Sequence, residues 1–252
     1  MRPHPKWVQK GIILIFSGPP GSGKGTYGKI LARRWGMCHV SLGDLIRQKL
    51  SNCTLNGDSK ARVSCGLLIQ DTLASEICKD HISSHPERQS WILDGFPRTL
   101  QQVELLRGFA TPHACINFIV PRHILLKKLL GRRICSSCGG CFNVANICDE
   151  PYDMPPILPT KECSHCKGNA PLTTRSDDTE EAIRNRLDFY EQITRPMLGQ
   201  FEAEGILLNF EVIKGTKDIA RLEDALISFL NKKHDVKANR FGLHPGDSNE
   251  TS

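Results

Sequence analysis

Apolar and polar positions follow two patterns along the chain. Short, nearly continuous apolar runs are typical of buried strands, whereas apolar residues three or four apart are typical of helices with one buried face. The apolar runs predict strands at 12–16, 37–40, 91–94, 115–120 and 206–210. The helical spacing predicts helices at 27–35, from 42 onward, and at 66–80, 101–107, 122–130, 179–201 and 217–230. Because strands and helices alternate from end to end, we predict an α/β fold with a central parallel sheet covered by helices on both faces.

Local signals predict where some of these elements end. Asn56 and the glycine after it predict a turn inside a polar stretch. Asp178, with Glu181 three residues later, is typical of a capping pair at the start of the helix from 179, and Pro196 predicts a kink within that helix. Residues 233–252 are polar and contain Gly and Pro, so we predict a disordered tail.

A glycine-rich turn, Gly18 to Thr26, joins the first predicted strand to the first predicted helix. In such a turn the missing Cβ atoms let backbone N–H groups point inward, and the helix N-terminus adds partial positive charge, so the turn can bind a di- or triphosphate. Lys24 would add a full charge at the outer phosphates. The hydroxyl usual directly after the lysine is replaced by Gly25 and recurs as Thr26, so we expect a less direct link to magnesium. The alternative is a turn that only joins strand to helix.

A carboxylate and a guanidinium follow the third predicted strand. Asp94 ends the apolar run, and Arg98 leaves the turn shaped by Gly95 and Pro97. In parallel α/β sheets the carboxyl ends of the strands form the binding edge. We therefore expect Asp94 to hold magnesium beside the phosphate-binding turn, with Arg98 facing the same edge.

Six of the eleven cysteines lie close together between residues 135 and 166. Two C-x-x-C pairs, Cys135 with Cys138 and Cys163 with Cys166, can each bring two thiolates to one ion and together complete a tetrahedral zinc site. With no open position for water, such a site would be structural. Cys141, Cys148 and His165 are rival ligands; the alternatives for the cluster are reduced cysteines without metal and a redox pair.

Composition limits the class of protein. The chain has 252 residues, of which 39% are apolar and 24% charged, as expected for a globular protein. Its apolar runs are too short to cross a bilayer, and no secretory signal is visible, so we expect a cytoplasmic protein with no membrane partner. Arg2, Lys6 and Lys10 leave a mitochondrial or other organelle lumen as the alternative. The net charge of +6 fits a polyanionic ligand, or a basic surface without a role.

Four segments of the chain resemble the adenylate kinase family. They are Gly18 to Thr26, Ser41-Leu42-Gly43-Asp44 with Arg47, Asp94-Gly95-Phe96-Pro97-Arg98-Thr99 with Gln102, and Thr174-Arg175-Ser176-Asp177-Asp178 with Arg186. The resemblance spans roughly residues 11–232 and implies the P-loop nucleotide kinase fold. It implies a core domain of residues 1–40, 78–126 and 180–232 with two mobile inserts, one for the monophosphate at 41–77 and a lid at 127–179. The cysteine pairs resemble the zinc-bearing lids of some members, and the lid length is similar to that of long-lid organellar kinases of plants.

The resemblance also implies roles for individual residues. The implied catalytic residues are Lys24, Asp94, Arg98, Arg132, Arg175 and Arg186. ATP would contact Gly21, Ser22, Gly23, Lys24, Gly25, Thr26, Lys128, Arg132 and Lys217. AMP would contact Leu42, Arg47, Leu68, Ile69, Gly95, Arg98, Gln102, Arg175 and Arg186. The implied zinc ligands are Cys135, Cys138, Cys163 and Cys166, and Asp177 and Asp178 would orient arginines at the lid hinge.

The implied activity is reversible, magnesium-dependent transfer of the terminal phosphoryl group of ATP to AMP, giving two ADP, by a monomer. Lys128 stands where many members carry an arginine that stacks on adenine, and Leu42 where adenine-selective members carry threonine, so a different donor or acceptor base is the alternative. A non-catalytic nucleotide sensor would be expected to lack one of the charged residues above. A zinc-dependent nucleic-acid binder is disfavoured because the insertion carries Asp149, Glu150 and Asp153 in place of a basic stripe.

Overall fold

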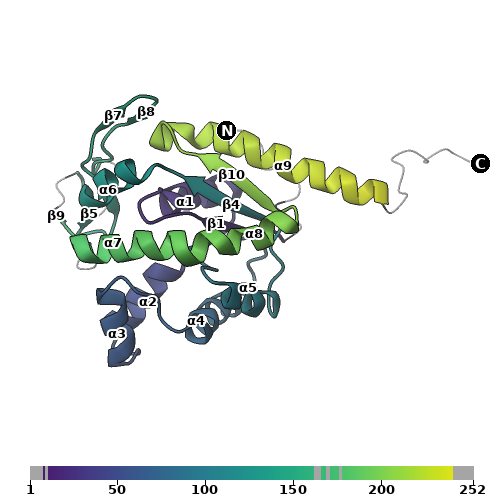
Figure 1. The fold of residues 1–252 in the computed structure, drawn as a ribbon, viewed down its shortest axis with the longest axis horizontal. Helices are drawn as coiled ribbons and strands as arrows, with labels where there is room; N and C mark the ends of the chain where they lie inside the picture. The colour runs from purple at the N-terminus through teal and green to yellow at the C-terminus, as the bar shows by residue number, and fades with distance from the viewer. Residues whose placement is uncertain (1–7, 9–10, 162–165, 169–170, 176–177, 241–252) are drawn as a thin grey trace, which may run out of the picture.

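A five-stranded parallel sheet forms the centre of the computed structural model, in the order β10-β4-β1-β3-β2 (Figure 1). Its strands are β1 (Ile13–Ser17), β2 (Cys38–Ser41), β3 (Trp91–Asp94), β4 (Ala114–Ile119) and β10 (Leu207–Glu211). Helices cover both faces, which confirms the predicted fold class. The structure describes all residues except 1–7, 9–10, 162–165, 169–170, 176–177 and 241–252, and only the backbone of 233–240.

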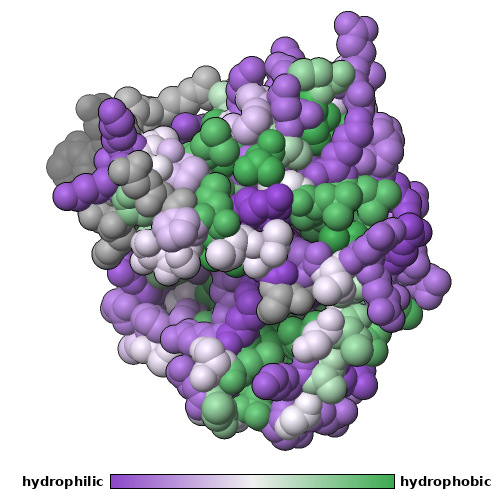
Figure 2. Space-filling view, turned by 90° about the vertical axis from the view of Figure 1, so that its left-hand side faces the viewer, coloured by the Kyte–Doolittle hydropathy of each residue, from purple (hydrophilic) through white to green (hydrophobic). Residues whose placement is uncertain are grey.

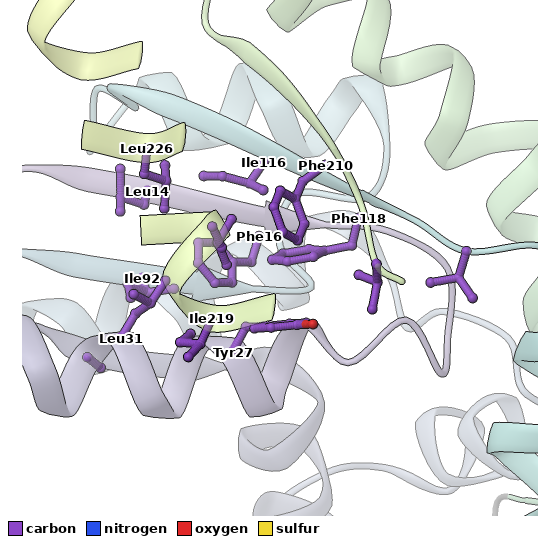
Figure 3. Packing of buried hydrophobic residues seen from close by; sticks show 14 of the residues in the cluster. Leu14, Phe16, Tyr27, Leu31, Ile92, Ile116, Phe118, Phe210, Ile219 and Leu226 are labelled. Carbon is purple, nitrogen blue, oxygen red and sulfur yellow. The ribbon is translucent and has the colours of Figure 1, made fainter. Parts of the chain in front are cut away.

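The two faces of the sheet bury separate apolar clusters. Because successive strand residues point to opposite faces, Leu14 and Phe16 belong to one cluster and Ile15 to the other. The first cluster is covered by α1 (Lys24–Trp35), α6 (Arg122–Leu130) and α9 (Ile219–Arg240). Figure 3 shows this cluster, in which the Tyr27 ring stacks on Phe118 with centroids 5.2 Å apart. The second is covered by α4 (Asp71–Ser83), α5 (Leu100–Arg107) and α8 (Arg195–Ala203).

The predicted turn at Asn56 is the start of a helix. After β2 the chain forms α2 (Leu42–Ser51) and then α3 (Gly57–Ser64), and the Asn56 side chain accepts a hydrogen bond from Ser59 N at 3.0 Å as the N-cap of α3. α3 was not predicted from the sequence, because Ser59 is its one buried residue and the segment therefore has no apolar periodicity.

The capping pair predicted for the helix from 179 is wrong. α7 (Glu180–Phe189) is capped by Thr179, whose hydroxyl accepts from Ala182 N at 3.2 Å, while the Asp178 carboxylate binds arginines. A π-helical turn, η2 (Tyr190–Thr194), then joins α7 to α8. Pro196 lies in the first turn of α8, directly after this turn, and the kink expected there stays a prediction.

Two other helix boundaries differ from the prediction. The helix expected from residue 66 begins at Asp71. α9 continues to Arg240, so the backbone of 233–240 is helical where a disordered tail was predicted, and 241–252 lie outside the described residues. Across the described ranges, none of the helices has both the length and the apolar character needed to cross a bilayer.

The predicted lid contains short strands that the sequence did not reveal. β5 (Arg132–Cys135), β6 (Cys141–Asn143) and β9 (Leu172–Thr173) form a three-stranded antiparallel sheet, the knuckle sheet. β7 (Ile147–Asp149) and β8 (Tyr152–Met154) form a separate hairpin.

On the side of the molecule formed by β5, α7 and α3, hydrophilic residues divide the apolar surface into separate patches (Figure 2).

The β7–β8 hairpin packs on the core. Ile147 and Met154 are 1% and 4% exposed and belong to the same apolar cluster as Leu14. Asp153 N donates to the Ile213 carbonyl at 3.0 Å. Tyr152 Oη donates to Glu211 at 2.7 Å, and Lys217 Nζ lies 3.2 Å from Asp153 Oδ2. The middle of the predicted lid is therefore bound to the end of β10 and to the residues that follow it.

Candidate active site

The glycine-rich segment 18–26, the phosphate loop, turns directly from β1 into α1. Gly21 and Gly23 have φ values of 85° and 92°, in the left-handed region that favours glycine. Gly23 is the N-cap of α1 and supplies no side-chain oxygen to the first helical N–H groups. Lys24 Nζ donates to the Pro19 carbonyl at 3.2 Å, so the lysine side chain lies over the loop. The loop has the geometry of an anion-binding site at a helix N-terminus.

Lys24 is held in an environment that disfavours its charge. Burial lowers the pKa of Lys24 to about 7; Asp94 opposes this shift, and the positive charges of Arg98, Arg186 and Arg132 add to it. A bound polyphosphate would supply the missing negative charge and restore the ammonium form. The lysine is therefore matched to an anionic ligand.

The close approach of Asp94 explains why the residue directly after Lys24 is a glycine and carries no hydroxyl. A Cβ atom at Gly25 would lie 2.8 Å from Asp94 Oδ2, so a side chain there would displace the carboxylate. Asp94 is 8% exposed, and its Oδ2 lies 3.6 Å from His39 Nε2, a buried nitrogen that makes no hydrogen bond to the described residues. A carboxylate against the phosphate loop fits a divalent cation with oxygen ligands. The sequence analysis missed His39, because only the pairing of β2 with β3 brings it beside Asp94.

Asp178 holds two of the predicted arginines together. Its side chain is 3% exposed, and Oδ2 accepts from Arg132 Nε at 2.6 Å. Oδ1 accepts from Arg186 Nη1 at 3.3 Å and also contacts Arg132 Nη2. Both guanidinium groups are more than four-fifths buried. This ion-pair network joins β5 of the knuckle sheet to α7.

Arg98 is fixed by its own turn. Its Nε donates to the Gly95 carbonyl at 2.7 Å. Burial lowers the pKa of Arg98, Asp94 opposes the shift, and the positive charges of Arg47 and Arg175 add to it. These effects place three of the predicted arginines, Arg47, Arg98 and Arg175, in one electrostatic environment. Asp177 lies outside the described residues.

Two adjoining pockets open at the carboxyl edge of the sheet. The first, the phosphate pocket, contains the phosphate loop and Lys24 and reaches Gly95. The second, the acceptor pocket, is mainly apolar and contains most of the residues predicted to bind AMP: Leu42, Arg47, Leu68, Ile69, Arg98, Gln102 and Arg186. Four residues line both pockets: Gly66, Leu68, Arg98 and Arg186. Groups bound in the two pockets would therefore lie next to each other, with Arg98 and Arg186 between them.

The π-helical turn η2 contributes two residues that the sequence analysis missed. Tyr190 and Thr194 line the phosphate pocket. Thr194 Oγ1 donates to the Arg98 carbonyl at 3.0 Å, and Tyr190 Oη donates to Asn117 Oδ1 at 2.9 Å. The wider turn lets both side chains face the site. The only feature near this turn that the sequence pointed to was Pro196, which follows it.

Two residues predicted to bind ATP, Lys128 and Lys217, lie beside the β7–β8 hairpin. Burial lowers the pKa of Lys128 to about 8, with Asp218 opposing the shift. Its Nζ lies 3.6 Å from Met154 Sδ and close to the phosphate loop at Gly23. Lys217 is exposed and forms an ion pair with the hairpin. The structure thus brings Lys128 to the loop and directs Lys217 toward β8.

Three of the four predicted knuckle cysteines come together. The sulfur atoms of Cys135, Cys138 and Cys166 lie within 4.8 Å of one another. Desolvation opposes ionisation of Cys135, but hydrogen bonds from Cys138 and from Ser137 N hold the pKa of its thiol below the ordinary value. Three converging thiols of this kind fit a thiolate-preferring metal such as zinc.

The remaining cysteine predictions have different outcomes. Cys163 and the rival ligand His165 lie outside the described residues. Cys141 and Cys148 are exposed and are not members of the three-cysteine group. Among the described residues, the three-cysteine group therefore favours the two C-x-x-C pairs as metal ligands over Cys141 and Cys148.

Comparison with known proteins agrees with this site. The family model described as "Adenylate kinase" matches residues 16–206. The chain is 40% identical over 223 residues to an adenylate kinase of Borrelia turicatae, covering 87% of this chain and 99% of the relative. It is 35% identical over 220 residues to the GTP:AMP phosphotransferase of Plasmodium falciparum (86% and 96%) and 38% identical over 222 residues to the "Probable adenylate kinase 6, chloroplastic" of Arabidopsis thaliana (84% and 74%). The chain therefore belongs to the adenylate kinase family and is a phosphotransferase.

Proposed function

We propose that the protein transfers the terminal phosphoryl group of ATP to AMP, reversibly and with magnesium, giving two ADP. The observation that carries this proposal is the wall shared by the phosphate pocket and the acceptor pocket, formed by Gly66, Leu68, Arg98 and Arg186. A single-nucleotide hydrolase needs no second pocket of this kind. A monophosphate held in the acceptor pocket would direct its oxygen toward the outer phosphate over the phosphate loop.

The residues of the site can lower the barrier without forming a covalent bond. Asp94 and Thr26 would hold magnesium, which neutralises charge on the phosphates when it is bound. Lys24 binds the outer phosphates, and the arginines at 98, 132, 175 and 186 surround the group that moves. The acceptor phosphate is already ionised near neutral pH, so no general base is required. We propose that the inserts at 41–77 and 127–179 move and exclude water from the assembled site.

The residue at position 128 bears on the choice of donor base, because Lys128 has a flexible ammonium where a planar guanidinium would stack. The relative from Plasmodium falciparum is named a GTP:AMP phosphotransferase, which makes a GTP donor the second candidate. Steady-state kinetics with ATP or GTP as donor and AMP as acceptor distinguish the two. We expect the larger kcat/KM with ATP; a larger value with GTP would reassign the donor.

We further propose a structural zinc ion held by the two cysteine pairs. The expected content is about one zinc per chain, because two C-x-x-C pairs complete one tetrahedral site. Cys138→Ser should lose the zinc, whereas Cys141→Ser should keep it, since Cys141 lies outside the three-cysteine group. Metal analysis after size-exclusion chromatography checks both variants. A metal-free wild-type protein whose melting temperature does not respond to a chelator would contradict the site.

We propose a cytoplasmic monomer that acts on free nucleotides. The name of the Arabidopsis relative assigns that protein to the chloroplast, so an organelle is the alternative compartment for this chain. Light scattering of the full chain tests the monomer, and microscopy of a C-terminally tagged chain in its native cell tests the compartment.

A further inference from the structure

Asp71 joins two elements at the acceptor pocket. It is the first residue of α4, and both of its carboxylate oxygens accept hydrogen bonds from the start of α5. Oδ1 accepts from Gln102 Nε2 at 2.7 Å, and Oδ2 accepts from Thr99 Oγ1 at 2.9 Å. Thr99 in turn caps α5 by accepting from Gln102 N at 3.1 Å. Neither the sequence analysis nor the family roles implied above include Asp71.

These contacts fix the orientation of the Gln102 amide. Its Oε1 accepts from Arg98 N at 2.8 Å, while its Nε2 donates to Asp71. A backbone N–H can only donate and an ionised carboxylate can only accept, so a flipped amide would face two mismatched partners. Gln102 is 1% exposed, and a mismatched group at this depth would not be relieved by water.

Gln102 is also the polar group best placed to distinguish bases. The described residues that line the acceptor pocket are apolar, glycine or cationic, except for Gln102. After its bonds to Arg98 N and Asp71, the amide keeps one N–H and one carbonyl lone pair. This pair complements adenine, which has an acceptor at N1 and a donor at N6; guanine presents the reverse, a donor at N1 and an acceptor at O6.

We propose that Asp71 is a positioning residue that sets the preference for an adenine acceptor by locking the orientation of the Gln102 amide. The inference rests on the proposed function, in which the acceptor base occupies this pocket. A guanine acceptor would require the amide to flip, which would turn its carbonyl toward the Asp71 carboxylate and its NH₂ toward Arg98 N. Asp71 thus acts through Gln102 and does not itself touch the base.

The test is the ratio of kcat/KM for AMP to that for GMP, measured with saturating donor. Asp71→Asn keeps the shape of the side chain but can donate to a flipped Gln102, so the ratio should fall about tenfold, the effect of one buried hydrogen bond. Asp71→Glu keeps an acceptor-only group and should stay closer to the wild-type ratio even though it changes size more. Asp80→Asn removes the same charge from an exposed position on α4 and should leave the ratio unchanged.

The outcomes separate this inference from the proposed function. Equal ratios in Asp71→Asn and Asp71→Glu, or a uniform loss for both acceptors in Asp71→Asn, would make Asp71 a structural residue only and overturn the inference. A wild-type enzyme without a preference for AMP over GMP would overturn the proposed acceptor together with it. Calorimetric binding gives the ratio of the affinities for AMP and GMP independently of turnover, and unfolding followed by circular dichroism shows whether each variant is folded.

Discussion

The phosphate pocket and the acceptor pocket share a wall but differ in how they are built. Around the phosphate pocket, cations are buried and are held by fixed partners such as Asp178 and the Gly95 carbonyl. The acceptor pocket is lined mainly by apolar side chains and by the amide of Gln102. Charge stabilises any phosphoryl group that moves, whatever base it carries, whereas a single amide in an apolar pocket distinguishes one base from another. Changes near the phosphates should therefore alter rate, and changes near the acceptor base should alter selectivity.

Lys24→Ala should give the largest effect, because it removes the cation over the phosphate loop. We expect kcat to fall about 10³-fold for every acceptor, as is typical when a preorganised charge at the reacting group is lost. A coupled assay with several monophosphates measures the loss. Arg33→Ala, a matched control on the exposed side of α1, should keep wild-type turnover. A Lys24→Ala enzyme that loses activity for one base only would contradict the division between the pockets.

Asp178→Ala should lower the free energy of unfolding by about 3 kcal/mol, because two largely buried guanidinium groups would lose their shared partner. Urea denaturation without nucleotide measures the change. Asp188→Ala breaks the exposed ion pair with Arg122 and should change stability by less than about 1 kcal/mol. Equal effects of the two variants would show that Arg132 and Arg186 are supported by other contacts.

Nucleotide binding above neutral pH should take up protons at Lys24. In the free protein its pKa is about 7, against an ordinary value of 10.5, so at pH 8 the amine is mostly neutral and a bound polyphosphate would recharge it. Calorimetry in buffers of different ionisation enthalpy should show uptake on the order of one proton, with a smaller share from Lys128. AMP alone, bound in the acceptor pocket, should give much less uptake.

The same shift makes the ligand-free protein sensitive to pH. The unfolded chain binds more protons than the folded one between the folded pKa of about 7 and the ordinary 10.5, so Lys24 makes stability rise with pH across that window. Lys24→Met should remove this rise. A stability profile that falls over the same window in wild type would contradict the sign of the shift.

Leu42→Thr should have the smallest effect and act on selectivity. Leu42 is 3% exposed and lines the acceptor pocket, so a hydroxyl at this position can reach the acceptor base. We expect the preference for AMP over other monophosphates to rise about threefold, within the range of one hydrogen bond. Leu67→Thr, at the 43% exposed rim of the same pocket, is the control. Unchanged relative kcat/KM values in Leu42→Thr would remove position 42 from base selection.

Features of the fold and the site that depend on neighbouring residues could be predicted from the sequence, whereas contacts between residues distant in sequence could not. The strands of the sheet and the phosphate loop were predicted because buried runs and glycine spacing are local signals. α3 carries too few apolar residues for such a signal, and the two- and three-residue strands of the lid are too short to show one. Asp178 has the local features of a cap, but its tertiary pairing with Arg132 decides its role. The contacts of His39 with Asp94 and of Asp71 with Gln102 join residues far apart in sequence, so only the folded structure reveals them.

The packing of the β7–β8 hairpin on the core divides the long insertion into two shorter loops, which changes the entropy cost of closing it. The connection from β5 to the short strand β9 spans 136–171, and an unattached connection of that length would lose much conformational entropy when its ends are brought together. Ile147 and Met154 attach its midpoint to the core, so the connection behaves as two shorter loops that close separately. Lengthening the connection on one side of the hairpin should therefore leave the connection on the other side unaffected.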